Sequence, residues 1–150
     1  MKVLFLDFDG VLNSSRTCAA FDGYPFNLKG DLPQFDHVAI ALIRKVCEQT
    51  GCKVVISSTW RRGTSLQEIK DVMDLPVIDR TPMGREHGLP LSAERGHEIA
   101  NWLERNPHVV QYAIVDDECF DIHQRGRLVQ TSQEDGLRWE DYEKLLELLK

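Results

Sequence analysis

The sequence lacks closely spaced cysteines and long hydrophobic runs. Its four cysteines include no pair at the C-x-x-C spacing that zinc ribbons and dithiol redox motifs need. We expect free thiols in a reducing environment, with Cys52 and Cys119 buried beside apolar runs. The first apolar run, residues 3–6, is too short for the core of a signal peptide or for a membrane span. The sequence therefore predicts a cytoplasmic protein that does not enter a membrane.

The sequence also has fewer basic than acidic residues. Lys and Arg number 18 against 24 Asp and Glu, so the net charge is −6 and a broad basic face for nucleic acid is not expected. A local basic groove is still compatible with this balance. Its candidate members are six arginines: Arg16, Arg61, Arg62, Arg80, Arg85 and Arg95.

The chain has no internal repeat, low-complexity tract or obvious linker. Hydrophobic residues make up 42% of its 150 residues and charged residues 28%, which excludes a disordered chain and allows a proper core. We therefore predict a single domain over residues 1–150.

Apolar runs bounded by charge or glycine predict the strands. Residues 3–6, 54–56 and 112–115 are continuous runs of strand-forming residues and are typical of buried strands. Shorter runs at residues 77–78 and 128–129 predict two short strands, the second at a sheet edge. Strands that alternate with helices indicate an α/β fold, a three-layer Rossmann-like parallel sheet with helices on both faces.

Apolar residues at three-to-four spacing predict the helices. The first predicted helix begins at Asp36 and ends at Gly51, and the second begins at Thr64 or Ser65. The third begins at Ser92 and ends near Pro107, and the fourth covers residues 139–149. Residues 13–35 show no sustained period and are expected to be irregular.

Polar side chains follow three of the predicted strands. They are Asp7 and Asp9 after the first run, Ser57 and Ser58 after the second, and Asp116 and Asp117 after the run at 112–115. If these strands are parallel neighbours, the polar groups meet at one edge of the sheet, where ligands of α/β folds bind.

Several carboxylates at one edge would repel each other without a cation, and hard oxygen ligands suit Mg²⁺. Asp7 and Asp9 face the same way along an extended chain, so one can attack while the other handles a proton. Gly10 allows a sharp turn after them. A single aspartate at such a position is more often a surface or capping residue, but two such motifs after two buried strands favour a site. Ser57 and Ser58 form either an ordinary turn or a phosphate-binding segment.

These motifs resemble those of the haloacid dehalogenase-like (HAD) phosphohydrolases. The first family motif is similar to DFDGVLN at residues 7–13, the second to VVIS at 54–57 and the fourth to AIVDD at 113–117. They occur in the family's order. The segments SSTWR at 57–61, RGHEI at 95–99 and the pair Trp102-Leu103 further resemble small HAD domains of phage and bacterial proteins, some of which are linked to nucleic-acid end repair.

The resemblance implies a Mg²⁺-dependent phosphatase that works through an aspartyl-phosphate. Asp7 would be the nucleophile and a metal ligand, and Asp9 the acid and base, with its backbone carbonyl on the metal. Either Ser57 or Ser58 would hold the phosphoryl group. In the fourth motif Asp116 would ligate the metal, and Asp117 would ligate it through water or orient the site.

The third motif of the family is usually a lysine. Residues 92–111 contain none, and Arg95 is the best candidate for its role, with a planar two-pronged contact in place of a point charge. The alternative is a solvated surface arginine, in which case Arg61 or Arg62 could supply the cation. His97 and His123 are candidate substrate contacts, although surface or packing roles are commoner for histidine.

Three alternatives to a phosphatase are compatible with clustered acids. They are a receiver-like signalling domain, a metal-dependent nuclease, and a catalytically silent domain that only binds phosphate. A receiver would normally carry its acid pair after the first strand and its phosphoacceptor on a later one. The order here is the reverse, with D-x-D first and D-D late, which disfavours the receiver.

Residues 14–36 form at most a short cap-like insertion, and residues 62–92 are too few for a folded cap. The site is therefore expected to be open and to act on a nucleic-acid end or other macromolecular phosphate, with a nucleotide as the second choice. The insertion carries aromatic residues that either stack on a base or pack the loop onto the domain: Phe21, Tyr24, Phe26 and Phe35. No obligate protein partner is indicated.

Overall fold

The computed structural model describes residues 1–82, 94–119 and 122–150. Its centre is a five-stranded sheet in the order β3-β2-β1-β4-β5, and every neighbouring pair is parallel. The strands are β1 (Lys2–Leu6), β2 (Lys53–Ile56), β3 (Val77–Arg80), β4 (Gln111–Asp116) and β5 (Leu128–Gln130). The α/β fold class is confirmed, and the short runs at 77–78 and 128–129 lie in the two edge strands.

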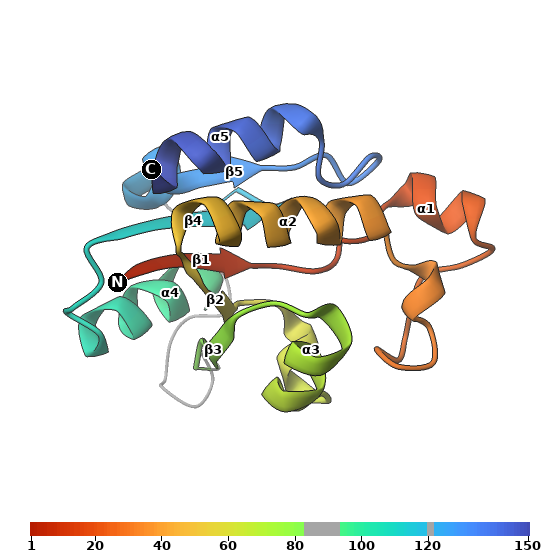
Figure 1. Cartoon of the computed structure of the whole chain (residues 1–150), viewed down its shortest axis with the longest axis horizontal. Helices are drawn as coiled ribbons and strands as arrows, with labels where there is room; N and C mark the ends of the chain where they lie inside the picture. Colours follow the sequence, from red (N-terminus) through yellow and green to blue (C-terminus); the bar gives the residue numbers. More distant parts are fainter. Residues whose placement is uncertain (83–93, 120–121) are drawn as a thin grey trace.

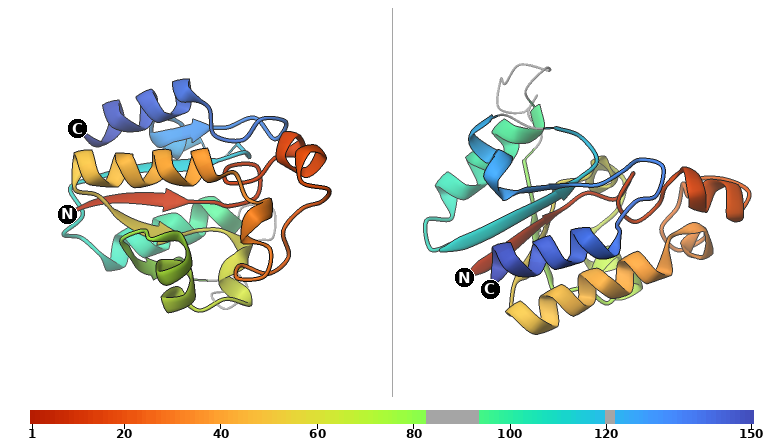
Figure 2. Two further views of the ribbon diagram at one scale, coloured as in Figure 1. Left: turned by 45° about the vertical axis from the view of Figure 1, so that its right-hand side comes forward. Right: turned by 90° about the horizontal axis from the view of Figure 1, so that it is seen from above.

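Helices cover both faces of this sheet (Figure 1). The helices are α1 (Ser15–Ala20), α2 (His37–Thr50), α3 (Leu66–Met73), α4 (Glu94–Arg105) and α5 (Trp139–Leu149), with 3-10 turns η1 (Leu32–Gln34), η2 (Thr59–Arg62) and η5 (Ile122–Arg127). Figure 2, seen from above, places α2 and α5 side by side on one face and α4 on the other.

Two apolar clusters hold these layers together because side chains alternate along each strand. Leu4 and Leu6 of β1 point into the larger cluster with buried residues of α2, α3 and α5. Val3 and Phe5 point the other way and pack against Ile99 and Trp102 of α4 with other strand residues. The sheet is therefore buried on both sides, which explains why its strands are continuous apolar runs.

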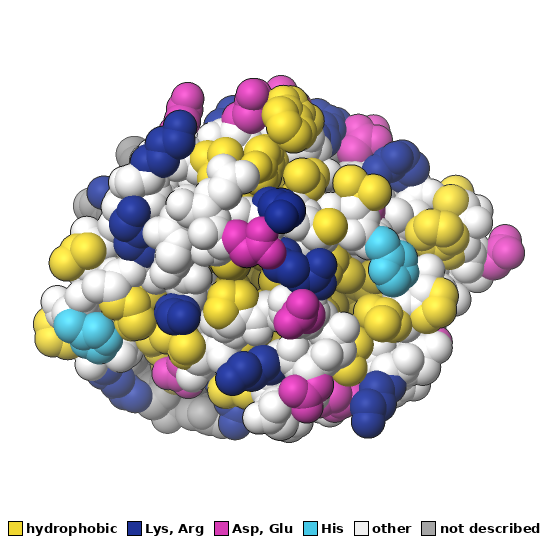
Figure 3. All heavy atoms as spheres, viewed as in Figure 1, with side chains coloured by type: hydrophobic (Ala, Val, Ile, Leu, Met, Phe, Trp, Pro, Cys, Tyr) yellow, Lys and Arg dark blue, Asp and Glu magenta, His cyan; other side chains and the backbone are white. Residues whose placement is uncertain are grey.

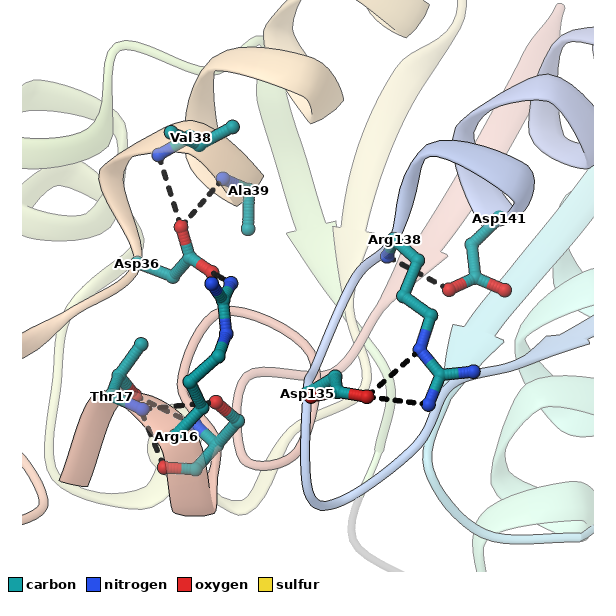
Figure 4. Close-up of polar contacts among 9 residues, drawn as sticks. Arg16, Thr17, Asp36, Val38, Ala39, Asp135, Arg138 and Asp141 are labelled. Atoms are coloured by element: carbon teal, nitrogen blue, oxygen red, sulfur yellow. Dashed lines mark hydrogen bonds and ion pairs between the residues drawn. The ribbon is translucent and has the colours of Figure 1, made fainter. Parts of the chain in front are cut away.

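The predicted limits of α2 are confirmed by its caps. The Asp36 carboxylate accepts from the backbone N–H groups of Val38 and Ala39, both at 3.1 Å, and also meets the guanidinium of Arg16 (Figure 4). At the other end Gly51 takes a left-handed conformation with φ of 72°. Ser65, one of the two residues expected there, caps α3, whereas Ser92, the expected cap of α4, lies outside the described residues.

Two expectations were wrong. Residues 13–35 are not wholly irregular, because Ser15–Ala20 form a helix whose start is closed by reciprocal hydrogen bonds between Ser14 and Thr17. This helix has six residues and no apolar stripe, so periodicity did not reveal it. Cys52 is buried as expected, but Cys119 is exposed because the chain has already left β4. In the described part of the chain, no helix has both the length and the apolar character to cross a membrane.

Candidate active site

The carboxyl ends of β1 and β4 bring three aspartates together. Asp7 directly follows β1, Asp116 is the last residue of β4, and Asp117 comes next. One carboxylate oxygen from each lies within 4.8 Å of the other two. Asp7 and Asp116 are buried, at 3% and 0% exposure, because the neighbouring strands and their loops enclose this edge. Three converging oxygen donors form a candidate site for a hard cation.

Burial makes this cluster electrostatically costly. Loss of solvation, followed by repulsion from Asp116, raises the pKa of Asp7 from 3.8 to about 8. Burial likewise raises the pKa of Asp116 to about 6, against the opposing effect of Arg95. One arginine is therefore insufficient to keep both carboxyl groups fully ionised near neutral pH.

Arg95 is the cation inside the cluster. It stands in the first turn of α4, and its Nη1 lies 3.2 Å from Oδ2 of Asp7 and 2.6 Å from Oδ2 of Asp116. Its side chain is only 19% exposed, so these contacts are poorly screened by solvent. Facing carboxylates raise the pKa of Arg95 against the effect of burial, and the guanidinium stays charged.

Asp9 lies beside the cluster and is exposed. Its Oδ1 accepts two hydrogen bonds, one from Nδ2 of Asn13 at 2.9 Å and one from the indole Nε1–H of Trp60 at 3.1 Å. Neither donor was predicted from the sequence to have a role in the site. Asn13 could have been found because it belongs to the first motif, and its Oδ1 also accepts from the N–H of Gly10 at 3.2 Å. Trp60 is 51 positions away, and although it stands in the SSTWR segment, no local pattern indicated that it meets Asp9.

Gly10 allows the backbone to approach the acidic cluster. Its φ is +76°, and a Cβ atom at this position would lie 2.5 Å from the side chain of Asp117. Its carbonyl oxygen accepts a 2.6 Å hydrogen bond from the Thr131 hydroxyl, which follows β5. The turn at Gly10, within the first motif, is thus tied to the segment that follows the edge strand β5.

The two serines after β2 are both fully buried. The Ser57 N–H donates to the Leu6 carbonyl at 3.1 Å, so this residue continues the pairing between β1 and β2. The Ser58 Oγ accepts from the Trp60 N–H at 3.2 Å and caps η2. Ser58 therefore has a local structural task as the cap of η2.

Residues 3–142 match a protein-family model described as the HAD domain in Swiss Army Knife RNA repair proteins. The chain belongs to this family. The match covers most of the sequence, and it confirms the resemblance carried by the aspartate motifs. No curated protein and no solved structure matches the chain.

In this HAD domain, a cavity of about 630 Å³ opens next to Asp9. One wall is the insertion at residues 24–28, and the other comes from η2 and α3. Figure 2 shows these two segments facing each other, the insertion in orange and η2 in yellow-green. The cavity is lined by both aromatic and polar side chains, among them Tyr24, Phe26, Trp60 and Glu68.

The remaining candidate residues of the HAD domain lie in different places. Arg16 pairs with Asp36 and its side chain is 64% exposed, while Arg80 and His97 are exposed on β3 and α4. The other candidates fall outside the described side chains: Arg61, Arg62, Arg85 and His123. Arg95 contacts Asp7 and Asp116, two of the three clustered aspartates.

Proposed function

We propose that this HAD domain is a Mg²⁺-dependent phosphomonoesterase that forms an aspartyl-phosphate on Asp7 and acts on phosphorylated ends of nucleic acid. The observation that carries the proposal is the buried carboxylate of Asp7, held by Arg95 among two further carboxylates at the carboxyl edge of the sheet. Membership of a family of HAD-type phosphohydrolase domains supports the same chemistry.

The residues present fit a magnesium ion. Asp7, Asp116 and Asp117 offer three hard oxygen ligands within 4.8 Å of each other. Burial, and after it repulsion between carboxylates, raises the pKa of Asp7 and Asp116, so one more positive charge would stabilise their ionised forms. The backbone carbonyl of Asp9 would complete the protein's share of ligands. Once bound, the ion would polarise the phosphoryl oxygens and neutralise their charge.

The chain's own groups then divide the reaction. An oxygen of Asp7 attacks phosphorus, and the bond to the leaving oxygen breaks as Asp9 gives that oxygen a proton. Water next attacks the aspartyl-phosphate, gives its proton to Asp9, and releases inorganic phosphate. Arg95 stabilises the negative charge on the transferring group. The hydroxyl of Ser57, or that of Ser58 as the alternative, would hold a phosphoryl oxygen.

Two features favour nucleic-acid ends as substrate. The matching family is described by its place in RNA repair proteins. In addition, the cavity beside Asp9 is bordered by a short insertion rather than a folded cap, and this insertion leaves Tyr24 and Phe26 exposed. An open site needs a substrate large enough to contribute binding energy away from the phosphate.

The activity is tested with the purified chain and a panel of phosphate esters, with and without Mg²⁺. Asp7→Asn should abolish phosphate release, since an amide is a poor nucleophile and a weak ligand for Mg²⁺. Asp22→Asn is the matched control, because Asp22 is an exposed aspartate at φ of 60°, a conformation that asparagine tolerates. Full activity of Asp7→Asn, or of the wild type after verified metal removal, would refute the mechanism.

Substrate size is tested separately through kcat/KM. We expect a 3′- or 5′-phosphorylated oligonucleotide to be preferred over the matching mononucleotide and over a phosphosugar. A clear preference for the small substrates would refute the macromolecular substrate and leave the phosphatase assignment in place. Phosphate binding without turnover would instead indicate the signalling or silent alternatives.

A further inference from the structure

The cavity beside Asp9 has a defined relation to the proposed reaction. Asp9 lies in its lining, and the proposed role of Asp9 is to protonate the oxygen that leaves phosphorus. The group attached to that oxygen must therefore lie near Asp9, on the side where this cavity opens. With about 630 Å³, the cavity falls in the size range of sites that bind small molecules.

The aromatic residues of the insertion are divided between two roles. Phe35 is fully buried, with its ring centre 6.3 Å from that of Phe8 and 5.5 Å from that of Trp60. It packs the insertion onto the domain. Phe26 and Tyr24 are 86% and 44% exposed and line the cavity instead. Packing within the domain therefore does not account for the position of Phe26.

A hydrogen-bonded turn holds Phe26 in this exposed position. The carboxylate of Asp31 accepts from the backbone N–H of Phe26 at 2.8 Å and from that of Asn27 at 2.9 Å. The N–H of Asp31 in turn donates to the carbonyl of Asn27 at 3.0 Å. The loop is thus closed on itself by its own polar groups, and the large apolar ring that it carries faces solvent at the edge of the cavity.

Polar side chains also line this cavity. Asn27 and Glu68 come from opposite walls, the insertion and α3, and their side chains can exchange hydrogen bonds with a ligand. Trp60 belongs to the same wall as Glu68, is half-buried, and donates its indole N–H to Asp9. Aromatic faces combined with amide and carboxylate groups suit a flat heterocycle with polar edges.

We propose that this cavity binds the terminal nucleobase of the phosphorylated nucleic acid, which stacks against Phe26 and presents its polar edge to Asn27 and Glu68. The inference rests on the proposed function, since it places the leaving group of that reaction. It adds a base-binding subsite, so that the enzyme distinguishes an end that carries a base from one that has lost it.

The test is a binding measurement on the full chain carrying Asp7→Asn, which keeps the phosphate on the ligand. Two oligonucleotides are compared, identical in length and terminal phosphate, one with a normal terminal nucleotide and one with an abasic terminal sugar. We expect the abasic end to bind about fivefold to a hundredfold more weakly, the range that the loss of one stacked base produces.

Two further variants locate the effect. Phe26→Ala should weaken binding of the normal end by a similar factor and remove most of the difference between the two ends, because the ring and the base report one contact. Phe21→Ala is the control, since Phe21 is a 43% exposed aromatic of the same insertion that does not belong to the cavity lining. It should keep the full difference.

The outcomes separate this inference from the proposed function. Equal affinity for the two ends, or a difference that survives Phe26→Ala, overturns the base-binding subsite whether or not the enzyme is a phosphatase. Failure of the wild-type chain to release phosphate overturns the proposed function, while a base preference that depends on Phe26 would still establish the subsite. Because Phe26 is 86% exposed, its truncation should leave the fold intact, which circular dichroism can verify.

Discussion

Arg95 lies where a positive charge is most needed, between the buried carboxylates of Asp7 and Asp116. We expect Arg95→Ala to lower kcat by tenfold to a thousandfold, about the loss seen when a charge-stabilising donor is removed. Arg95→Lys should restore part of the rate, since the lysine ammonium keeps the positive charge but lacks the planar two-pronged geometry of the guanidinium. Steady-state phosphate release measures both, and Arg105→Ala, an exposed arginine of the same helix, is the control. An unchanged rate in Arg95→Ala would assign the role to another cation.

Trp60 is the second residue whose effect should be visible in the chemistry. Trp60→Phe removes the indole donor to Asp9 but keeps a ring against Phe8 and Phe35. We expect kcat to fall on the order of tenfold with poor leaving groups, because a misplaced acid no longer assists departure. With 4-nitrophenyl phosphate, whose leaving group needs little protonation, the loss should be much smaller.

The dependence on the leaving group distinguishes positioning from simple destabilisation. Trp102→Phe is the matched control, since the Trp102 indole also donates to an aspartate, Oδ2 of Asp79 at 2.8 Å, but does so away from the three aspartates. It should lower stability without changing the ratio of the two substrates. Equal losses on both substrates in Trp60→Phe would contradict a role in positioning Asp9.

At the scale of elements, α2 depends on its first residues. The Asp36 carboxylate satisfies two of the N–H groups that a helix leaves unpaired at its start. Asp36→Ala should cost about 1 kcal/mol of unfolding free energy and lower Tm by about 2–4 °C in a chain of this size. Denaturant and thermal unfolding measure these changes.

A second substitution separates the cap from the ion pair. Asp36→Asn keeps an oxygen acceptor but removes the charge that faces Arg16 at 3.4 Å, a contact of small expected value because the Arg16 side chain is 64% exposed. It should retain most of the wild-type stability. If Asp36→Asn is as unstable as Asp36→Ala, the ion pair rather than the cap stabilises this end of α2.

At the scale of the whole molecule, surface charge is mixed while the site is acidic. On the face shown in Figure 3, Lys and Arg side chains are interspersed with Asp and Glu, and no extended patch of one sign is visible. A net charge of −6 agrees with this picture. Attraction of a nucleic acid to this protein should therefore depend on contacts near the site more than on a long-range positive field.

The acidic cluster should make the free energy of unfolding depend on pH and on Mg²⁺. Burial raises the pKa of Asp7 to about 8 and that of Asp116 to about 6, so the metal-free folded chain holds protons that the unfolded chain has lost. Its stability should therefore fall as pH rises from about 4 to about 8, and then level off. Mg²⁺ competes with these protons, so the Tm gain from Mg²⁺ should grow over the same interval.

Thermal shifts with and without Mg²⁺ across this pH range provide the measurement. At a concentration a hundredfold above its Kd, a single bound ion contributes about 2.7 kcal/mol. Asp116→Asn should remove most of the Mg²⁺-dependent gain. A gain that is independent of pH, or unchanged in Asp116→Asn, would place the ion elsewhere.

Local patterns in the sequence were sufficient to predict much of the fold. The strands at 3–6, 54–56 and 112–115 were recognisable because a sheet buried on both faces needs continuous apolar runs. The limits of α2 followed from Asp36 and Gly51, since caps depend on nearby backbone groups alone. The meeting of Asp7 with Asp116 followed from parallel pairing once the order of strands was assumed.

Tertiary structure alone decided which equivalent-looking residues face the core and which face a ligand. No pattern in the sequence distinguished the aromatic residues of the insertion from one another, yet Phe35 is buried and Phe26 is exposed. Both Cys52 and Cys119 were predicted to be buried, yet Cys52 is buried and Cys119 is exposed. Trp60 meets Asp9 across 51 positions of chain. These outcomes depend on contacts between distant segments, whose geometry is set by how the whole chain packs and leaves no periodic trace in the sequence.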